Sequence, residues 1–353
     1  MQQSITASLP VETIGLDLGD RRTSYCHLSA AGLVAKEGEL ATKANILEHF
    51  FEQGTPCRVV VEASGHVHWV AALARRRGHE VIVANPREVR LISQGGRKTD
   101  RSDARILAQL GRVDPALLRP VTLRGEGCRA SRALLATRDQ LVHSRTRLVN
   151  LVRGQVKTAG GRIPTCSAES FHKRASAHIP PGLAAACSPS LAVLTALAEQ
   201  IKACDEQVER ACEEQHPETN ILRQIPGVGP TLALAYVATL ETTARFRSSR
   251  SLGNYVGLTP RRDDSGARSP ELRISKRGDA LLRRLLVNAA TYTLGPFGPD
   301  SDLRRHGQRL ARSGSQRDRA RARIAVARKL ACLLHHLWRT GSVYQPLREG
   351  PTR

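Results

Sequence analysis

The first third of the chain alternates short apolar runs with stretches of helical spacing. In the segment that ends at Leu18, the residues Ile14, Leu16 and Leu18 alternate with Gly15 and Asp17, and this period of two predicts a strand with two different faces. Three opening strands followed by alternating helices and strands predict a mixed sheet with helices on its faces. The further strands are expected at 24–28, 33–37, 58–62 and 80–84, and the helices at 43–52 and 67–77.

The middle of the chain is almost wholly helical in pattern. Leucines and valines recur at helical spacing over 128–156 and again over 191–214, with a break rich in glycine and proline between the two runs. Two long helices joined in this way predict either an antiparallel hairpin or a coiled coil that joins two copies of the chain.

The last third of the chain contains a glycine turn before an alanine-rich helix. The motif IPGVGP precedes the helix expected at 231–240 and is typical of a helix-hairpin-helix turn. In such a turn, Gly227 and Gly229 would let backbone amides approach a phosphate at a helix N-terminus. An ordinary glycine-rich connection between helices is the alternative. A further amphipathic helix is expected at 325–337.

These patterns together predict an α/β plus α protein in three parts. A mixed-sheet domain is expected at 11–120, a helical connector at 126–215 and a mainly helical domain at 218–340. The length of 353 residues and the hydrophobic content of 41% are sufficient for packed cores in two or three domains.

The net charge of the chain indicates what kind of molecule it binds. The chain carries 54 Lys and Arg against 32 Asp and Glu, a formal net charge of +22, and 46 of the basic residues are Arg. The guanidinium group suits bidentate contacts to phosphate and guanine, so nucleic acid is the first expected partner and a membrane surface the second. The sequence has no apolar run of 18 residues and no signal-peptide pattern, so we expect no membrane association and a cytoplasmic location. Eight scattered cysteines without a CxxC pair predict reduced thiols rather than a zinc site.

Four acidic residues fall on predicted elements of the sheet domain. Asp17 lies in the first strand, Glu62 ends the strand RVVVE, and Asp100 and Asp103 share one face of a predicted helix. Such a set of carboxylates suits two Mg²⁺ (or Mn²⁺) ions that assist phosphoryl transfer on nucleic acid. Each acid also has a plainer interpretation, as a solvated strand end for Glu62 and as helix-start residues for the two aspartates.

The motifs GLDLG, VVEASG and KTDRSDA, in this order, resemble the DEDD transposase domain of insertion-sequence transposases. Downstream, IPGVGPTLA, then SLGNYVGLTPRRDDSG, then ISKRGDALLRRLLVNAA resemble the C-terminal transposase domain of the same family. The resemblance extends over residues 12–340. It implies a RuvC-like, ribonuclease-H-like first domain and a DNA transposase that excises and inserts a mobile element.

The resemblance also implies roles for individual residues. Asp17, Glu62, Asp100 and Asp103 match the four metal-binding acids of the family, and Ser265 in the motif DDSG matches its serine nucleophile. That serine is understood to attack a DNA phosphate and to form a phosphoserine intermediate. The residues expected to bind or position nucleic acid are Lys98, Gly227, Gly229, Arg261, Arg262, Arg268, Lys276 and Arg277.

One position departs from the family pattern. Many relatives carry two serines before the glycine of this motif, whereas here Asp264 occupies the first position. Ser265 directly precedes Gly266 and is therefore the matching residue. Asp263 and Asp264 bring two negative charges beside it, which metal or arginine must offset when a phosphate binds. Without the resemblance, DDSG is typical of a solvated turn.

The implied partners are double-stranded DNA at the element ends and the target, a structured bridge RNA, and further copies of the chain as a dimer or tetramer. Base pairing by such an RNA would carry most of the sequence choice, as in other RNA-guided systems. The acids and the serine, far apart in sequence, would meet through folding or across a subunit boundary, and the resemblance favours the boundary. The implied setting is the cytoplasm of a prokaryotic cell, at the nucleoid.

Two rival functions remain open from the residues alone. The first is a metal-dependent nuclease or junction resolvase, in which water attacks the phosphate and Ser265 takes no part. The second is a nucleic-acid-binding relative that has lost catalysis, against which the intact acids and serine argue.

Overall fold

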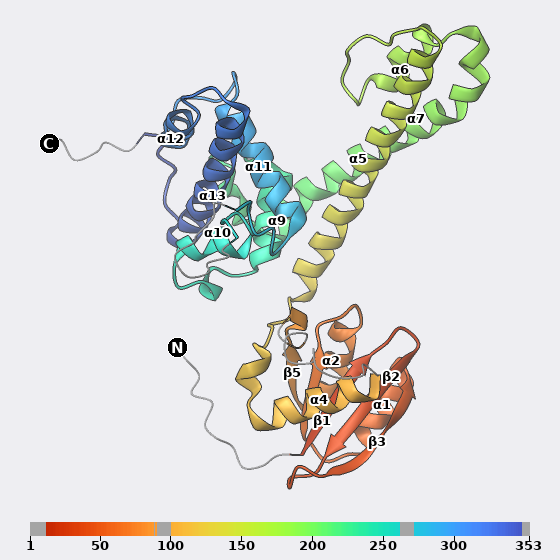
Figure 1. Ribbon diagram of the computed structural model, residues 1–353, viewed down its shortest axis with the longest axis vertical. Helices are drawn as coiled ribbons and strands as arrows, with labels where there is room; N and C mark the ends of the chain where they lie inside the picture. Colours follow the sequence, from red (N-terminus) through yellow and green to blue (C-terminus); the bar gives the residue numbers. More distant parts are fainter. Residues whose placement is uncertain (1–11, 88, 90–99, 262–271, 348–353) are drawn as a thin grey trace, which may run out of the picture. The chain divides into compact units, whose positions relative to one another are not determined.

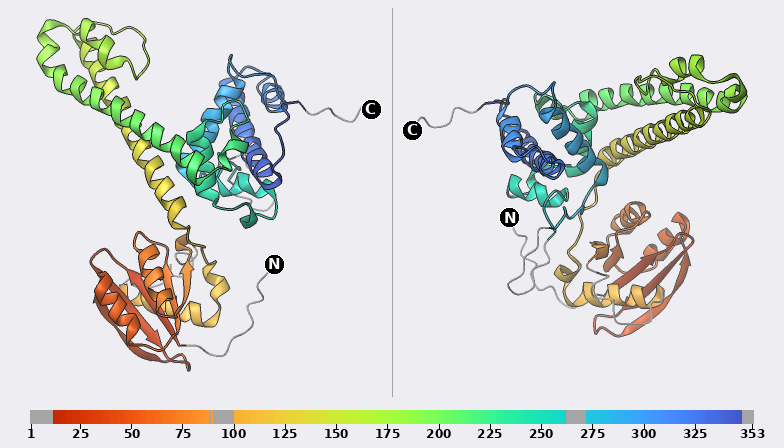
Figure 2. Two further views of the ribbon diagram at one scale, coloured as in Figure 1. Left: turned by 180° about the vertical axis from the view of Figure 1, so that it is seen from behind. Right: turned by 45° about the horizontal axis from the view of Figure 1, so that its top comes forward.

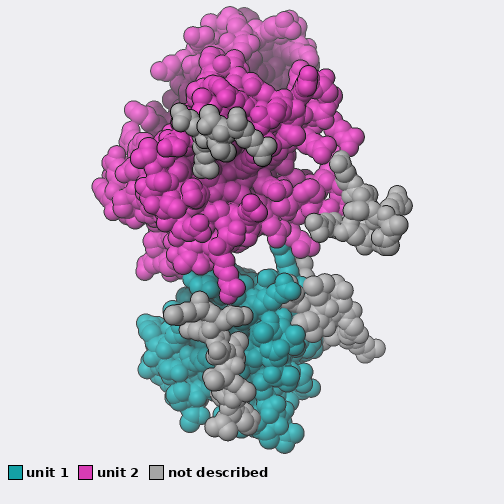
Figure 3. Space-filling model, turned by 90° about the vertical axis from the view of Figure 1, so that its left-hand side faces the viewer, with its two compact units in different colours: residues 1–123 teal, residues 124–353 magenta. Residues whose placement is uncertain are grey.

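The computed structural model describes residues 12–87, 89, 100–261 and 272–347. Two compact units make up the chain, residues 1–123 and residues 124–353 (Figure 3). The first is an α/β unit and the second is entirely helical apart from one isolated β-bridge among its described residues. This confirms the expected α/β plus α class. The division into three parts stays a prediction.

Unit 1 is built on a five-stranded mixed sheet (Figure 1). The strand order is β3-β2-β1-β4-β5, with antiparallel pairing among β3, β2 and β1 and parallel pairing among β1, β4 and β5. This topology fits the expected ribonuclease-H-like fold. The strands are β1 (Thr13–Leu18), β2 (Arg22–Leu28), β3 (Val34–Ala41), β4 (Arg58–Glu62) and β5 (Glu80–Ala84). The helices are α1 (Ala44–Glu52), α2 (Val67–Arg76), α4 (Asp100–Val113) and the 3₁₀ turn η1 (Pro115–Leu118).

The two faces of the sheet carry different side chains because strand residues alternate. Leu16 and Val61 belong to a core shared with α1 and α2. On the other face, Val60 packs with Leu107 of α4. Gly15 lies directly under α4, where a Cβ atom would be 2.1 Å from the backbone oxygen of Ala104. The helix therefore rests on the sheet at a contact that only glycine permits.

Unit 2 begins with two long helices that pack side by side, α5 (Glu126–Thr158) and α7 (Pro181–Arg210) (Figure 2). Val152 of α5 and Leu194 of α7 share a buried cluster with Phe171 of the short helix between them. The hairpin prediction is confirmed, and pairing between copies stays a prediction. The connecting segment contains α6 (Phe171–Ala175) and the 3₁₀ turn η2 (Ser176–His178).

The second long helix differs from its sequence prediction. It begins at Pro181 rather than ten residues later, and Pro189 lies inside it. Pro181 suits the first helical position, because the amide it lacks has no partner there in any helix. The break between helices expected at Pro180, Pro181 and Gly182 is in fact a helix start. A π-helical turn, η3 (Ala211–Gln215), ends the helix.

The segment Pro181–Gln215 is long and apolar enough to cross a membrane, with a mean hydropathy of 1.5 over its best window. This differs from the expectation that no segment could. Length and composition are weak evidence here, because a single apolar helix of a non-membrane protein meets the same test. The helix is also tied to α5 by the Arg138–Asp205 ion pair, and α5 carries further arginines, among them the buried Arg145. Arginines on the paired helix would be costly in lipid.

The remainder of unit 2 packs around α9 (Pro230–Leu240), in which every residue from Leu232 to Leu240 is buried. The Tyr236 hydroxyl donates a hydrogen bond of 2.6 Å to the backbone oxygen of Ala331 at the centre of this core. The other helices are α8 (Thr219–Leu222), α10 (Leu252–Tyr255), α11 (Ala280–Leu294), α12 (Asp302–Leu310) and α13 (Gln316–Thr340), with 3₁₀ turns η4 (Thr243–Arg245) and η5 (Ser249–Ser251).

Candidate active site and nucleic-acid interface

Asp17 and Glu62 lie at the ends of two neighbouring parallel strands, Asp17 one residue before the last of β1 and Glu62 as the last of β4. The last registered pair between β1 and β4 is Leu16 with Val61, and each acid follows one residue later. Asp17 shares a face with Gly15, and Glu62 shares a face with Val60, because side chains alternate along a strand. Both acids therefore lie on the face that α4 covers, at the end of the sheet where these strands finish. Both are half-buried.

The direction of α4 brings its acidic start to the same end. Arg58, at the start of β4, donates a hydrogen bond of 2.9 Å to the backbone oxygen of Gly111 near the end of the helix. From Gly111 back to Asp103 the helix rises by about 12 Å, at roughly 1.5 Å per residue. From Arg58 to Glu62 the strand advances by about 13 Å, at roughly 3.3 Å per residue. Asp103, also half-buried, thus lies at the level of Glu62.

The four acids differ in how far the structure brings them together. Asp17, Glu62 and Asp103 share one face and one end of the sheet, while Asp100 is exposed one turn earlier on α4. Within the described residues, no three Asp, Glu, His or Cys side chains are arranged closely enough to hold a metal ion. The donor set nevertheless has the right chemistry for a hard divalent cation, since carboxylate oxygens are the ligands that Mg²⁺ takes.

A histidine and an aspartate lie near this end of the sheet. The Nε2 atom of His66 is 3.5 Å from a carboxylate oxygen of Asp20, which belongs to the turn after β1. The indole nitrogen of Trp69 donates a hydrogen bond of 3.2 Å to Nδ1 of His66. His66 is therefore held by two neighbours, which fits a structural role at the start of α2 better than a metal ligand.

Ser265 lies outside the described residues, as do Lys98, Arg262, Arg268, Asp263 and Asp264. The structure does describe the base of the segment that contains Ser265. Pro260 and Ile274 form an antiparallel bridge, and the Arg261 amide donates to the backbone oxygen of Arg273 at 2.9 Å. The described residues on either side of Ser265 are therefore joined to each other by backbone pairing.

Tight turns lie close to this paired backbone. Gly257 has a φ of 72°, and a Cβ atom there would be 2.0 Å from the backbone oxygen of Arg277. Gly278 has a φ of 87° and packs against the backbone of Tyr255 in the same way. Lys276 also adopts a left-handed backbone, with a φ of 53°, although it carries a side chain. The three candidate cations in this region, Arg261, Lys276 and Arg277, are all exposed.

The glycine turn before α9 is described completely. Gly227 has a φ of 91°, and a Cβ atom there would be 2.7 Å from the ring of Tyr292, so only glycine fits. Gly229 is the N-cap of α9, and a Cβ atom there would have no neighbour within 4 Å. The open approach to Gly229 is compatible with a phosphate at the helix N-terminus. It is equally compatible with an ordinary connection between helices.

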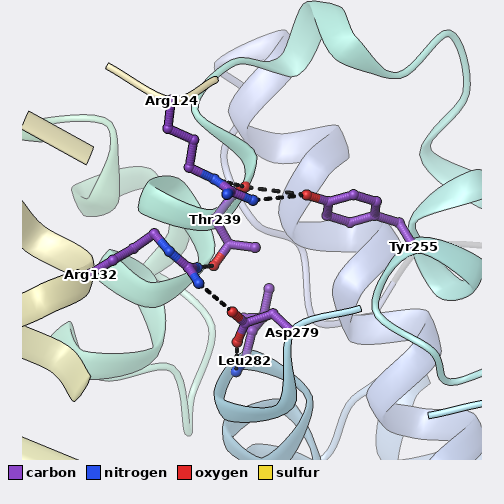
Figure 4. A network of polar contacts seen from close by, with 6 residues as sticks. All are labelled: Arg124, Arg132, Thr239, Tyr255, Asp279 and Leu282. Carbon is purple, nitrogen blue, oxygen red and sulfur yellow. Dashed lines mark hydrogen bonds and ion pairs between the residues drawn. The ribbon is translucent and has the colours of Figure 1, made fainter. Parts of the chain in front are cut away.

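A network of polar contacts joins α5 and the residue just before it to α9, α10 and the start of α11 (Figure 4). Arg132 donates to the Thr239 hydroxyl at 2.8 Å and to the Asp279 carboxylate at 2.7 Å. Arg124 donates to the Thr239 backbone oxygen and to the Tyr255 hydroxyl. Asp279 also accepts from the Leu282 amide as the N-cap of α11. The sequence reasoning missed this network, because an aspartate before a helix signals a cap and does not reveal a distant arginine.

A basic surface extends along α13 from Arg317 to Lys329. Exposed arginines recur along it with a single acidic residue among them, Asp318, which caps the helix start. These residues are Arg317, Arg319, Arg321, Arg323, Arg328 and Lys329. A helix so rich in exposed cations favours contact with a polyanion.

Comparison with known proteins gives consistent matches along the chain. A DEDD-type transposase model matches residues 14–160, and a model described as transposase IS116/IS110/IS902 family matches residues 219–304. A putative transposase of Sinorhizobium fredii, y4pF/y4sB, is 30% identical over 304 residues, 84% of this chain and 76% of the relative. A probable family 20 transposase of Pseudomonas aeruginosa is 28% identical over 84% of this chain and 88% of its own. The transposase for insertion sequence element IS1111A of Coxiella burnetii is 26% identical over 80% of this chain and 78% of its own.

Proposed function

The chain belongs to the IS116/IS110/IS902 transposase family, and we propose that it cuts and rejoins DNA through Ser265 with the help of a carboxylate-bound divalent metal. Membership makes the chain an enzyme that acts on DNA. The observation that most supports the finer proposal is the gathering of Asp17, Glu62 and Asp103 at one end of the ribonuclease-H-like sheet.

The acids would hold the metal and the loop would supply the nucleophile. Asp17 and Glu62 on neighbouring strands, with Asp100 and Asp103 on α4, are the proposed ligands. Mg²⁺ or Mn²⁺ bound there would offset the negative charge that develops on the reacting phosphate. The carboxylates are negatively charged and would repel a DNA phosphate. A cation bound to them would offset this repulsion.

The proposed reaction exchanges one ester for another. The Ser265 hydroxyl oxygen forms a bond to a DNA phosphorus while the bond from that phosphorus to a deoxyribose oxygen breaks. The serine proton passes to a base, and the released deoxyribose oxygen takes up a proton. Because the number of phosphate esters is unchanged, the second DNA end can reverse the step without an external energy source. Arg261, Lys276 and Arg277 at the base of the loop would hold the phosphate.

The proposed partners follow from charge and family. Double-stranded DNA fits a chain of net charge +22, and a structured bridge RNA would account for the basic surface of α13 in addition to that of the loop. A homo-oligomer would form through the α5–α7 hairpin, whose exposed face on α7 is uncharged from Pro181 to Ala198. The proposed setting is the nucleoid of a prokaryotic cell.

A denaturing-gel assay tests the proposal. The chain, purified with its own RNA, is incubated with labelled element-end DNA and Mg²⁺, in parallel with Ser265→Ala, Asp17→Ala and the exposed control Ser188→Ala. We expect a protease-sensitive protein–DNA adduct with the original chain and with Ser188→Ala, and none with the other two variants or with EDTA. Metal-dependent cleavage that survives Ser265→Ala would instead establish the nuclease function. DNA binding without cleavage or adduct in any version would establish a catalytically inactive relative.

A further inference from the structure

Unit 2 contains a cavity of about 570 Å³ that the proposed reaction does not use. It lies between the turn η5, the middle of α13, the start of α12 and the segment that follows α13. That segment is fixed at two points. The Tyr344 amide donates to the side chain of Gln224, and the Asp302 amide donates to the backbone oxygen of Pro346. The volume falls within the range of cavities that take small organic ligands, roughly 300–1,000 Å³.

Three cations line the cavity. Arg250 comes from η5, and Arg328 and Lys329 are neighbours on α13. In the described part of the chain, none of these three side chains forms an ion pair or a side-chain hydrogen bond, and Asp302 is the one acidic residue of the lining. The formal charge of the lining is therefore positive, and cations without partners favour an anion.

The Arg328 side chain packs against Gly253 of the neighbouring helix α10. Its aliphatic stem crosses Gly253 of α10, where a Cβ atom would be 2.8 Å from the Arg328 Cγ. A larger residue at this position would displace the stem. Because Gly253 has no side chain, the Arg328 stem can lie against the backbone of α10. Arg328 also belongs to the lining of the cavity.

The rest of the lining is apolar or carries rings. Leu303 and Leu333 contribute aliphatic surface, and Cys332 also belongs to the lining. His336 and Tyr344 contribute rings, both half-buried. A pocket whose lining combines apolar side chains, rings and unpaired cations has the chemistry of a nucleotide site, where a base stacks and a phosphate pairs with the cations.

We propose that this cavity binds one unstacked nucleotide of the nucleic acid that the enzyme holds. Arg250, Arg328 and Lys329 bind its phosphate, and the base lies against His336 and Tyr344. The adjoining arginines of α13 contact the strand on either side of the captured nucleotide. The nucleotide comes from RNA or from DNA, two sources with the same recognised chemistry. The inference goes beyond the cutting and rejoining of DNA, and it stands whether or not Ser265 is the nucleophile.

Cys332 provides a direct test, because its thiol lines the cavity. The full chain is treated with a small thiol-reactive thiosulfonate, and modification of each cysteine is followed by mass spectrometry. Cys128 on α5 is the internal control, since it is also half-buried and lies away from the cavity. Burial raises the pKa of both thiols, so the reaction is run at alkaline pH. The probes are adenosine 5′-monophosphate, its deoxy form, adenosine and inorganic phosphate.

We expect either monophosphate to slow modification of Cys332 at least fivefold and to leave Cys128 unchanged. A stronger effect of the ribose form assigns the site to RNA, and equal effects allow both nucleic acids. Adenosine or phosphate alone should protect much less, because each makes only half of the contacts. Equal protection by phosphate alone would reduce the cavity to an anion site and overturn the proposal, as would no protection by any probe.

Two variants distinguish nucleotide binding in the cavity from binding to the basic surface of α13. Replacing both cavity residues in the double variant Arg328→Ala, Lys329→Ala should abolish protection of Cys332 by the monophosphates. Arg323→Ala, an exposed arginine of the same helix on the side away from the cavity, should leave the protection intact. Protection that persists in the double variant would contradict the assignment. Since the original chain is tested with four probes, a double variant that fails to fold does not remove the test.

Discussion

Arg132 on α5 and Asp279 at the start of α11 form an ion pair, with 2.7 Å between the guanidinium and carboxylate atoms. Asp279 directly follows Gly278, which has a left-handed backbone and packs against Tyr255. The same aspartate caps α11, so one side chain both holds the helix start and pairs with Arg132. The pair therefore connects the long helix α5 to the start of α11 (Figure 4).

Removing the arginine should weaken both stability and reaction. We expect Arg132→Ala to lower the free energy of unfolding by about 1–3 kcal/mol, because a mostly buried carboxylate loses its charged hydrogen-bond partner. The yield of covalent adduct in the gel assay should also fall, since the start of α11 loses one of its contacts. Chemical denaturation and the gel assay measure the two effects. Arg129→Ala, an exposed arginine on the same helix, is the control, and equal effects of the two variants would refute the role of the pair.

The same pair predicts an acid-dependent loss of stability. Burial raises the pKa of Asp279, but the Leu282 amide and the Arg132 guanidinium outweigh it, so the pKa lies below its ordinary value. A lowered folded pKa means that the stabilisation is fully present above the unfolded pKa, about 3.9. It is lost as the pH falls from there through the folded pKa. We expect Asp279→Asn to remove part of the pH dependence of unfolding below about pH 4. An unchanged slope would show that Asp279 does not contribute.

The sheet of unit 1 was predictable because its signals are local. The alternation around Ile14 and Leu16 and the apolar run at 58–62 both follow from strand geometry and burial, and the structure has strands at both places. The start of α7 was not predictable in the same way. Consecutive prolines and a glycine usually end a helix, yet Pro181 is the first residue of one, and the buried contacts of Cys187 and Leu194 sustain the helix through Pro189.

The contact between Gly15 and α4 predicts a strong effect of one methyl group. We expect Gly15→Ala to displace the helix from the sheet, because the added Cβ atom would be 2.1 Å from the Ala104 oxygen and 2.5 Å from the Ala108 nitrogen. The acid at 103 would move away from Asp17 with the helix. Metal-dependent adduct formation should fall by at least tenfold and thermal stability should drop.

Gly54→Ala is the matched control, because nothing lies within 4 Å of a Cβ atom there and its backbone φ is not in the left-handed region. That variant should keep both activity and stability. If Gly15→Ala retained full activity with unchanged melting, the close approach of α4 to the sheet would not matter for the site.

Only part of the candidate site could be predicted from the sequence. The acids Asp17 and Glu62 could be placed on one sheet because each lies on a recognisable strand. The direction of α4 could not, since it depends on contacts such as that between Arg58 and Gly111, which are 53 residues apart. The cavity beside Arg328 was also out of reach, because it is formed by four segments that only the folded chain brings together.

Lys276 has a left-handed backbone. Two substitutions there can therefore distinguish the contribution of its side chain to DNA binding from the contribution of its backbone conformation to stability. Its φ of 53° is a conformation that glycine adopts at little cost and that a side chain makes less favourable by roughly 1 kcal/mol. We therefore expect Lys276→Gly to be more stable than Lys276→Ala by about that amount. Both variants lose the amine, so both should bind DNA more weakly, and the slope of log affinity against log salt should fall by about one.

Thermal unfolding and fluorescence anisotropy with element-end DNA at several salt concentrations measure the two effects. Lys202→Ala is the control, because that lysine is already within 3.9 Å of the Glu206 carboxylate on α7 and lies in the hairpin. It should leave the salt slope unchanged. If Lys276→Gly bound DNA as tightly as the original chain while gaining stability, Lys276 would be a residue of the turn alone. If instead it bound more weakly while gaining stability, the backbone strain at this position is retained for contact with phosphate.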